Sequence, residues 1–239
     1  MTARYVSAGL TVTGKVRRHN EDAILVRDDL GLWVVADGMG GHSAGDYASA
    51  LIAQRLGALT RSGSVFDFIE AIEDALEQVN TDLIAMARTR GVDIIGSTVV
   101  VLVHHHDYML CGWVGDSRAY CMEGGVLEQV TRDHVHGTKD DVTQFGGAPA
   151  APSPGAGVLT RAIGAEDRLF VDWQVAGCRP GMQFVLCSDG INKEMSDAEI
   201  AAVCQRQGDP QGVLNDLLGL ALGRAGRDNV SAVVVRLQD

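Results

Sequence analysis

Four aspartates in tight turns are spread over almost the whole chain, and their side chains have the chemistry of metal ligands. Asp37, Asp116, Asp189 and Asp228 stand in Asp-Gly-Met-Gly-Gly, Gly-Asp-Ser-Arg, Ser-Asp-Gly and Asp-Asn sequences. Hard divalent cations take oxygen ligands, and Mg²⁺ or Mn²⁺ usually keep several waters and only a few carboxylates. The Gly38 carbonyl is a further candidate ligand. Each turn alone has a purely structural explanation, but four converging carboxylates indicate a metal-dependent hydrolase.

A charged segment near the N-terminus adds groups suited to phosphate and to metal. Arg17 presents a planar fork of N–H donors that matches phosphate oxygens. Glu21 and Asp22 offer carboxylates to a metal shell. A solvated charged loop is the alternative interpretation of the segment, and we favour it for Arg18.

Two groups of histidines have different expected roles. His42 lies five residues after Asp37 and is a candidate catalytic acid that protonates a leaving alkoxide. A hydrogen-bonded structural histidine at a helix start explains His42 equally well, and both interpretations stay open. His134 and His136 border a glycine- and proline-rich segment, 137–157, and we expect both at the surface.

The elements that must position these residues come in blocks. Three of the aspartates follow apolar runs typical of strands, and long stretches with apolar residues every three or four positions predict helices. Because strands and helices do not alternate strictly, we expect an α+β fold with antiparallel sheets and helices on their faces. The predicted strands are 7–12, 24–29, 32–36, 97–103, 108–114, 118–122, 170–175, 184–187 and 230–237, and the predicted helices are 44–59, 65–90, 196–205 and 210–222.

Composition narrows the class of protein. The 239 residues are 46% hydrophobic and 21% charged, as in a globular protein, and the net charge of −11 argues against a nucleic-acid partner. The cysteine count of five is odd and no Cys-x-x-Cys occurs, so neither a disulfide framework nor a zinc site is expected. No apolar run is long enough for a signal peptide core or a membrane span. We therefore expect a cytoplasmic protein.

Seven short motifs follow one another along the chain: Arg17 with 20–23, 35–45, 96–98, 112–120, 159–164, 187–190 and 227–231. In this order they resemble the motifs of the metal-dependent serine/threonine phosphatases, the PPM or type 2C family, in bacterial form. The resemblance covers nearly the whole chain, from about residue 5 to 236. It implies a single domain, 1–239, folded as a four-layer α-β-β-α sandwich with two central antiparallel sheets and a short mobile flap at about 135–157.

The resemblance also implies a set of roles. Asp37 would bridge two Mn²⁺ or Mg²⁺ ions, and a hydroxide between the ions would attack phosphorus without a covalent intermediate. Asp116, with Asp189, would hold a third, weaker ion, and Arg17 would clamp the phosphate. The remaining ligands of the two core ions would be Asp189 and Asp228 on one ion and, on the other, the Gly38 carbonyl with Glu21 or Asp22 through water.

The sequence departs from the family pattern at two places, which concern the general acid and the flap. Met39 stands where animal members have a histidine proposed as general acid, which leaves His42 as the candidate. The flap is short and rich in Gly, Pro and Ala, and in this it resembles phosphatases encoded with type VI secretion systems.

The resemblance implies phosphorylated Ser/Thr proteins as substrates, together with a cognate bacterial Ser/Thr kinase whose action the enzyme opposes. We expect a monomer without nucleic-acid or membrane partners. Two alternatives stay open. One is a phosphoprotein-binding module without turnover, and the other is a phosphatase dedicated to a specialised partner such as an anti-sigma-factor antagonist.

Overall fold

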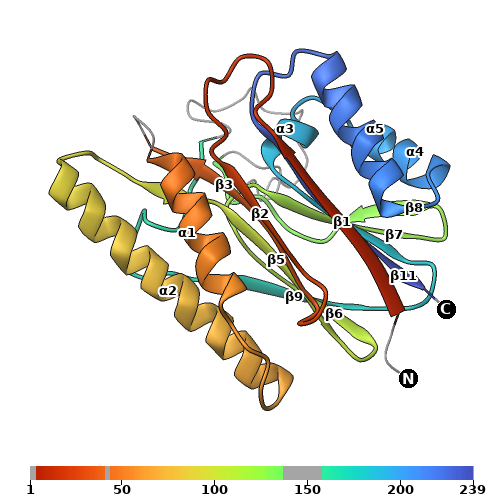
Figure 1. Cartoon of the computed structure of the whole chain (residues 1–239), viewed down its shortest axis with the longest axis horizontal. Coiled ribbons are helices and arrows are strands. Elements are labelled where there is room, and N and C mark those ends of the chain that lie inside the picture. Colours follow the sequence, from red (N-terminus) through yellow and green to blue (C-terminus); the bar gives the residue numbers. More distant parts are fainter. Residues whose placement is uncertain (1–3, 41–43, 137–157, 239) are drawn as a thin grey trace, which may run out of the picture.

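Every strand of the computed structural model, which describes residues 4–40, 44–136 and 158–238, pairs antiparallel with its neighbours (Figure 1). The strands form two sheets. The first has the order β1 (Arg4–Val12), β11 (Val230–Gln238), β10 (Gln183–Cys187), β7 (Arg118–Glu123) and β8 (Val126–Gln129). The second has the order β2 (Asp22–Arg27), β3 (Leu32–Met39), β5 (Val99–His105), β6 (Tyr108–Val114) and β9 (Asp172–Gly177), with the short β4 (Gly96–Ser97) paired to β3.

Helices cover the outer face of each sheet. The helices α1 (Gly45–Gly57) and α2 (Val65–Arg90) pack on the six-stranded sheet. The helices α4 (Asp197–Arg206) and α5 (Pro210–Gly223) pack on the five-stranded sheet, and the single turn α3 (Asp189–Asn192) follows β10. Figure 1 shows the two helix pairs on opposite sides of the strands. This arrangement confirms the predicted four-layer α-β-β-α sandwich.

The central strands are apolar on both faces because each face meets another layer. In β3, Trp33 and Val35 point into the layer between the sheets, whereas Val34 points toward α1 and α2. In β10, Leu186 points into the core between the sheets, whereas Val185 points toward the helices on the outer face. Side chains alternate faces along a strand, so burial on both sides explains the continuous apolar runs before the aspartates.

The helix boundaries follow capping chemistry. Ser64 and Asp67 form a capping box at the start of α2, and Gly91 ends that helix in the left-handed conformation at φ 64°. The Ser196–Glu199 capping box predicted for α4 is also present. None of the helices among the described residues is both long and apolar enough to cross a membrane.

The structure differs from the predicted elements in several places. The predicted strands 24–29 and 170–175 are each shifted by two residues, to Asp22–Arg27 and Asp172–Gly177. The predicted strand 97–103 is divided into β4 and β5, and α3 and β8 were not predicted. Both missed elements have only four residues, which is too short for a hydrophobic period to show. Most of the predicted flap, 137–157, and the catalytic candidate His42 lie outside the described residues.

Candidate metal and phosphate site

A pocket of about 370 Å³ gathers most of the predicted site residues at one end of the two sheets. The chain segments that line it are far apart in sequence, from the β1–β2 connection to the turn before β11. Seven of the nine predicted site residues line it, Asp22 is buried behind it, and His42 lies outside the described residues. The seven are Arg17, Glu21, Asp37, Gly38, Asp116, Asp189 and Asp228, and the pocket also contains Met39, Gly40, Thr98, Leu159 and Lys193.

Asp37 is held at the end of β3 by the Gly-Ser-Thr segment. The Asp37 N–H donates to Thr98 Oγ1 at 3.2 Å, while the Asp37 carbonyl accepts from Ser97 Oγ at 3.0 Å and from the Thr98 N–H at 2.8 Å. Thr98 Oγ1 also lies 2.7 Å from Ser117 Oγ, which joins this segment to the turn that carries Asp116. The backbone that positions both carboxylates is therefore cross-linked.

The glycines of the two Asp-Gly pairs are required by close packing. A Cβ atom on Gly38 would lie 2.0 Å from the Gly45 carbonyl oxygen and 2.7 Å from that of Glu21. A Cβ atom on Gly190 would lie 1.9 Å from the Asn229 carbonyl oxygen. Any side chain at these positions would push apart the segments that carry the pocket carboxylates.

Three of the pocket carboxylates form ion pairs with cationic side chains. Arg17 Nη2 lies 2.8 Å from Asp228 Oδ2, and Arg17 Nη1 lies 3.8 Å from Glu21 Oε2. The Lys193 ammonium pairs with Asp189 Oδ2. The other oxygen of Asp189, Oδ1, is buried and has no hydrogen-bond partner.

The concentration of acidic groups raises their proton affinity. Burial, followed by the charges of Asp22, Asp189, Asp228 and Asp116, raises the pKa of Asp37 well above its ordinary value. Burial and the neighbouring Asp189 raise the pKa of Asp116 to about 6. A divalent cation in the pocket would relieve this repulsion, because an opposite charge favours the ionised carboxylate.

The donor set fits Mn²⁺ or Mg²⁺. Asp37, Asp189 and Asp228 supply carboxylate oxygens, Gly38 supplies a carbonyl, and the unpaired Asp189 Oδ1 needs a cation or donor. Among the described residues, no three Asp, Glu, His or Cys side chains could hold one ion as they stand. An ion here would therefore keep water ligands, as Mg²⁺ and Mn²⁺ commonly do, or turn Asp228 away from Arg17.

Asp22 lies behind the pocket. Its side chain is buried, and Oδ2 accepts hydrogen bonds from Ser231 Oγ at 2.6 Å and from Ser188 Oγ at 2.8 Å. Burial raises the pKa of Asp22 to about 6, against the lowering effect of both hydroxyl donors. Asp22 pairs with Asp37 across β2 and β3. It contacts the strand ends that carry Asp189 and Asp228, and its predicted catalytic role stays a prediction.

Asn229 is a buried site residue that the sequence did not single out. Its Nδ2 donates to the Thr13 carbonyl at 2.8 Å and to the His19 carbonyl at 2.9 Å, and its Oδ1 accepts from the Glu21 N–H at 2.8 Å. These three bonds hold both ends of the loop that carries Arg17. The partners lie more than 200 residues away in sequence, so no local pattern could have revealed them.

We expect Asn229→Ala to lower both stability and phosphate affinity. Three backbone groups in part-buried hydrogen bonds would lose their partners, at a cost of up to about 1–3 kcal/mol each before relaxation. The net loss of unfolding free energy should be about 3 kcal/mol, and KM for a phosphopeptide should rise because Arg17 is no longer positioned. Urea denaturation and steady-state kinetics measure the two effects, and an unchanged KM in a folded variant would contradict this role.

His134 is buried, so the expectation that it lies at the surface is wrong. Its Nδ1 accepts from the Gly115 N–H at 3.1 Å, which leaves the proton on Nε2, and Nε2 donates to Asp172 Oδ2 at 3.0 Å. Asp172 also accepts from Arg161 at 3.2 Å. The histidine therefore buttresses the Gly115–Asp116 turn against β9.

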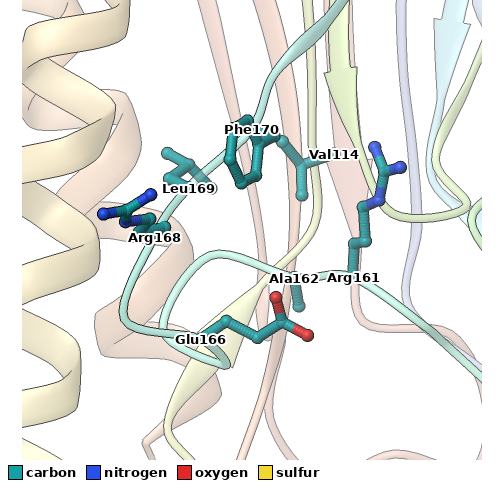
Figure 2. Close-up of a pocket in the computed structure, with 7 residues that line it drawn as sticks. All are labelled: Val114, Arg161, Ala162, Glu166, Arg168, Leu169 and Phe170. Carbon is teal, nitrogen blue, oxygen red and sulfur yellow. The ribbon is translucent and has the colours of Figure 1, made fainter.

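A second hollow, of about 70 Å³, is lined by the seven residues drawn in Figure 2. The hollow and the larger pocket are lined by the same two chain segments. Val114 and Arg161 line the hollow, whereas Asp116 and Leu159, each two residues away in sequence, line the larger pocket. Figure 2 shows the Phe170 ring beside Val114. Glu166 is its only acidic lining residue among those described, so this hollow lacks the donor set of a metal site.

Comparisons with known proteins agree with this geometry. The protein phosphatase 2C family model matches residues 15–216. Serine/threonine phosphatase stp of Listeria innocua is 28% identical over 94% of this chain and 93% of its own length. The solved structure of PppA, a key regulatory component of T6SS in Pseudomonas aeruginosa, is 40% identical with a TM-score of 0.89, covering 98% of this chain and 97% of that one.

A further relative shows which ions such a pocket accepts. The catalytic domain of the serine/threonine phosphatase PstP, solved in complex with two manganese ions, is 25% identical with a TM-score of 0.82, covering 98% of this chain and 99% of that one. The family match spans most of the chain, and the fold and pocket agree with it. The chain therefore belongs to the protein phosphatase 2C family and is a metal-dependent serine/threonine protein phosphatase.

Proposed function

We propose that this protein hydrolyses phosphoserine and phosphothreonine in proteins with two divalent cations held by Asp37, the Gly38 carbonyl, Asp189 and Asp228. The observation that carries the proposal is the single pocket that joins these oxygen donors with Arg17. A structural cluster of ion pairs would not leave Asp189 Oδ1 buried without a partner. PstP, with its two manganese ions, supports the same number of ions here.

Each residue has a defined task in this reaction. Arg17 is half exposed at the pocket mouth, where its guanidinium can leave Asp228 and donate two parallel N–H bonds to phosphate oxygens. Asp37 would supply carboxylate oxygen to the cations, whose positive charge would offset the charges of the pocket aspartates and of the incoming phosphate. When bound, Mn²⁺ or Mg²⁺ supplies Lewis acidity and makes a water acidic enough to act as the nucleophile near neutral pH.

The remaining predicted roles rest on the family resemblance. His42 stays the candidate donor of a proton to the leaving alkoxide, and Glu21 stays a candidate ligand through water. Glu21 supports this because its side chain lines the pocket and is mostly buried. A third, weaker ion at Asp116 stays a prediction.

We infer that the physiological substrates are proteins phosphorylated by a bacterial Ser/Thr kinase that this enzyme opposes. PppA, at 40% identity, is a regulatory component of a type VI secretion system, which supports a role in that kind of regulation. The five cysteines are free thiols, which suits the reducing cytoplasm. The chain is expected to act as a monomer on these partners.

Phosphate release from a phosphothreonine peptide tests the proposal. We expect turnover in Mn²⁺ or Mg²⁺, none in EDTA, and little activity on a matched phosphotyrosine peptide. Restoring Mn²⁺ after EDTA should restore the rate. A folded protein that binds the phosphothreonine peptide in saturating Mn²⁺ without hydrolysing it would refute the phosphatase mechanism and leave a binding module.

A further inference from the structure

An ammonium group occupies the side of the pocket where a third ion is predicted. Lys193 follows Asp189 by four residues, at the C-terminal end of α3. Residues four apart lie on one face of a helical turn, so this spacing carries the Lys193 side chain back over Asp189. Its Nζ pairs with Asp189 Oδ2, and Lys193 lines the same pocket as Asp116.

The two oxygens of Asp189 have different surroundings. Oδ1 is buried without a hydrogen-bond partner, and it is the oxygen available to the cations at Asp37 and Asp228. Oδ2 is bound to the Lys193 ammonium. A third ion shared by Asp116 and Asp189 would have to compete with Lys193 for Oδ2.

The charge of Lys193 also reaches Asp116. Burial and Asp189 raise the pKa of Asp116, and the Lys193 ammonium opposes them. A divalent cation placed between Asp116 and Asp189 would therefore meet a fixed positive charge within the same pocket. The energy of such a like-charge contact grows as the pocket excludes water.

We propose that Lys193 supplies, from within the chain, the positive charge that a third ion would bring to Asp116 and Asp189, and that it thereby weakens binding of that ion. The inference rests on the two core ions of the proposed function. Lys193 acts through Asp189 and is a positioning residue, because it leaves Oδ1 directed at the core ions. Binding of the two core ions does not require its removal.

Equilibrium dialysis with Mn²⁺ tests the inference without requiring turnover. Wild-type protein should bind two ions, whereas Lys193→Met should bind a third at least about tenfold more tightly than wild type does. Lys193→Arg keeps the charge and should behave as wild type. Arg179→Met is the matched control, because it removes one positive charge from an exposed ion pair with Glu123 outside the pocket.

Two further results decide where the extra ion binds. In the double variant Lys193→Met with Asp116→Asn, the third ion should be lost, and its persistence would overturn the proposal. The proposal would also be overturned if wild type and Lys193→Met bound a third ion with the same affinity, or if neither protein bound a third ion. The Lys193 side chain is 60% exposed, so Met is accommodated without disturbing the core. Failure of the phosphatase mechanism would show separately, as a lack of phosphate release in wild type.

Discussion

Replacing Asp37 with Asn should lower turnover of a phosphothreonine peptide by about a thousandfold and raise the stability of the metal-free protein. The loss is expected because Asp37 would be the carboxylate shared by both ions of the proposed site, and Lewis-acid stabilisation contributes several kcal/mol to the transition state. The gain in stability follows because Asn removes a charge that burial and four neighbouring aspartates disfavour. The variant therefore separates function from folding.

Initial rates in saturating Mn²⁺ and thermal melting in EDTA measure the two effects. Asp74→Asn is the matched control, because Asp74 is exposed on α2, outside the pocket, and undergoes the same chemical change. The control should leave both rate and melting temperature near wild type. Turnover of Asp37→Asn within tenfold of wild type would contradict the assignment of Asp37 as the shared ligand.

The metal-free protein should lose stability as pH rises from about 4.5 to 7.5, and Mn²⁺ should restore that stability at the upper end. Asp116 and Asp22 each have a pKa of about 6 in the fold, above the 3.8 of an unperturbed carboxyl. A raised pKa means that the fold favours the protonated acid. Its contribution is complete below the unfolded pKa and is lost as pH rises through 6.

The size of this effect follows from the two shifts. Each corresponds to at most about 3 kcal/mol at 1.36 kcal/mol per pKa unit, and coupling between neighbours reduces the sum. We therefore expect a loss of about 2 kcal/mol or more in EDTA. Urea unfolding at pH 5 and pH 7.5, with EDTA or Mn²⁺, measures it. Stability in EDTA that stays level or rises across this window would contradict the account.

The central strands could be predicted from the sequence because they are buried on both faces. The runs that become β3 and β10 are apolar at every position because helices cover one side and the other sheet covers the other. The aspartates that follow them mark strand ends, and these ends converge in one pocket. The Asp-Gly pairs also had a physical basis, since Gly38 and Gly190 allow backbone contact that no side chain permits.

Other parts of the site depend on contacts between distant segments. Glu21 and Asp22 are adjacent, yet only Glu21 lines the pocket, while Asp22 turns toward Ser188 and Ser231. No local pattern tells which of two neighbouring carboxylates faces which way at the start of a strand. The contacts of Asn229 were equally unpredictable from sequence, because its hydrogen-bond partners belong to the opposite end of the chain.

The structure corrects the prediction for one residue, His134, and reveals the position of another, Lys193, for which the sequence suggested no role. His134 sits beside a glycine- and proline-rich segment, which suggested exposure, but its ring bridges the Gly115 turn and Asp172. Lys193 drew no attention in the sequence because a lone lysine has no motif. The single turn of α3 places the Lys193 side chain against Asp189, where the two form an ion pair.

The most direct measurement is an anomalous difference map from crystals of the active protein grown in Mn²⁺. We expect two manganese peaks in the pocket, one on each side of the Asp37 carboxylate, with Asp189, Asp228 and the Gly38 carbonyl among their ligands. A third peak at Asp116 should be weaker than these two, because Lys193 competes with that ion for Asp189 Oδ2. No peak beside Asp37, in a preparation that hydrolyses the phosphothreonine peptide in the same Mn²⁺, would contradict the central claim.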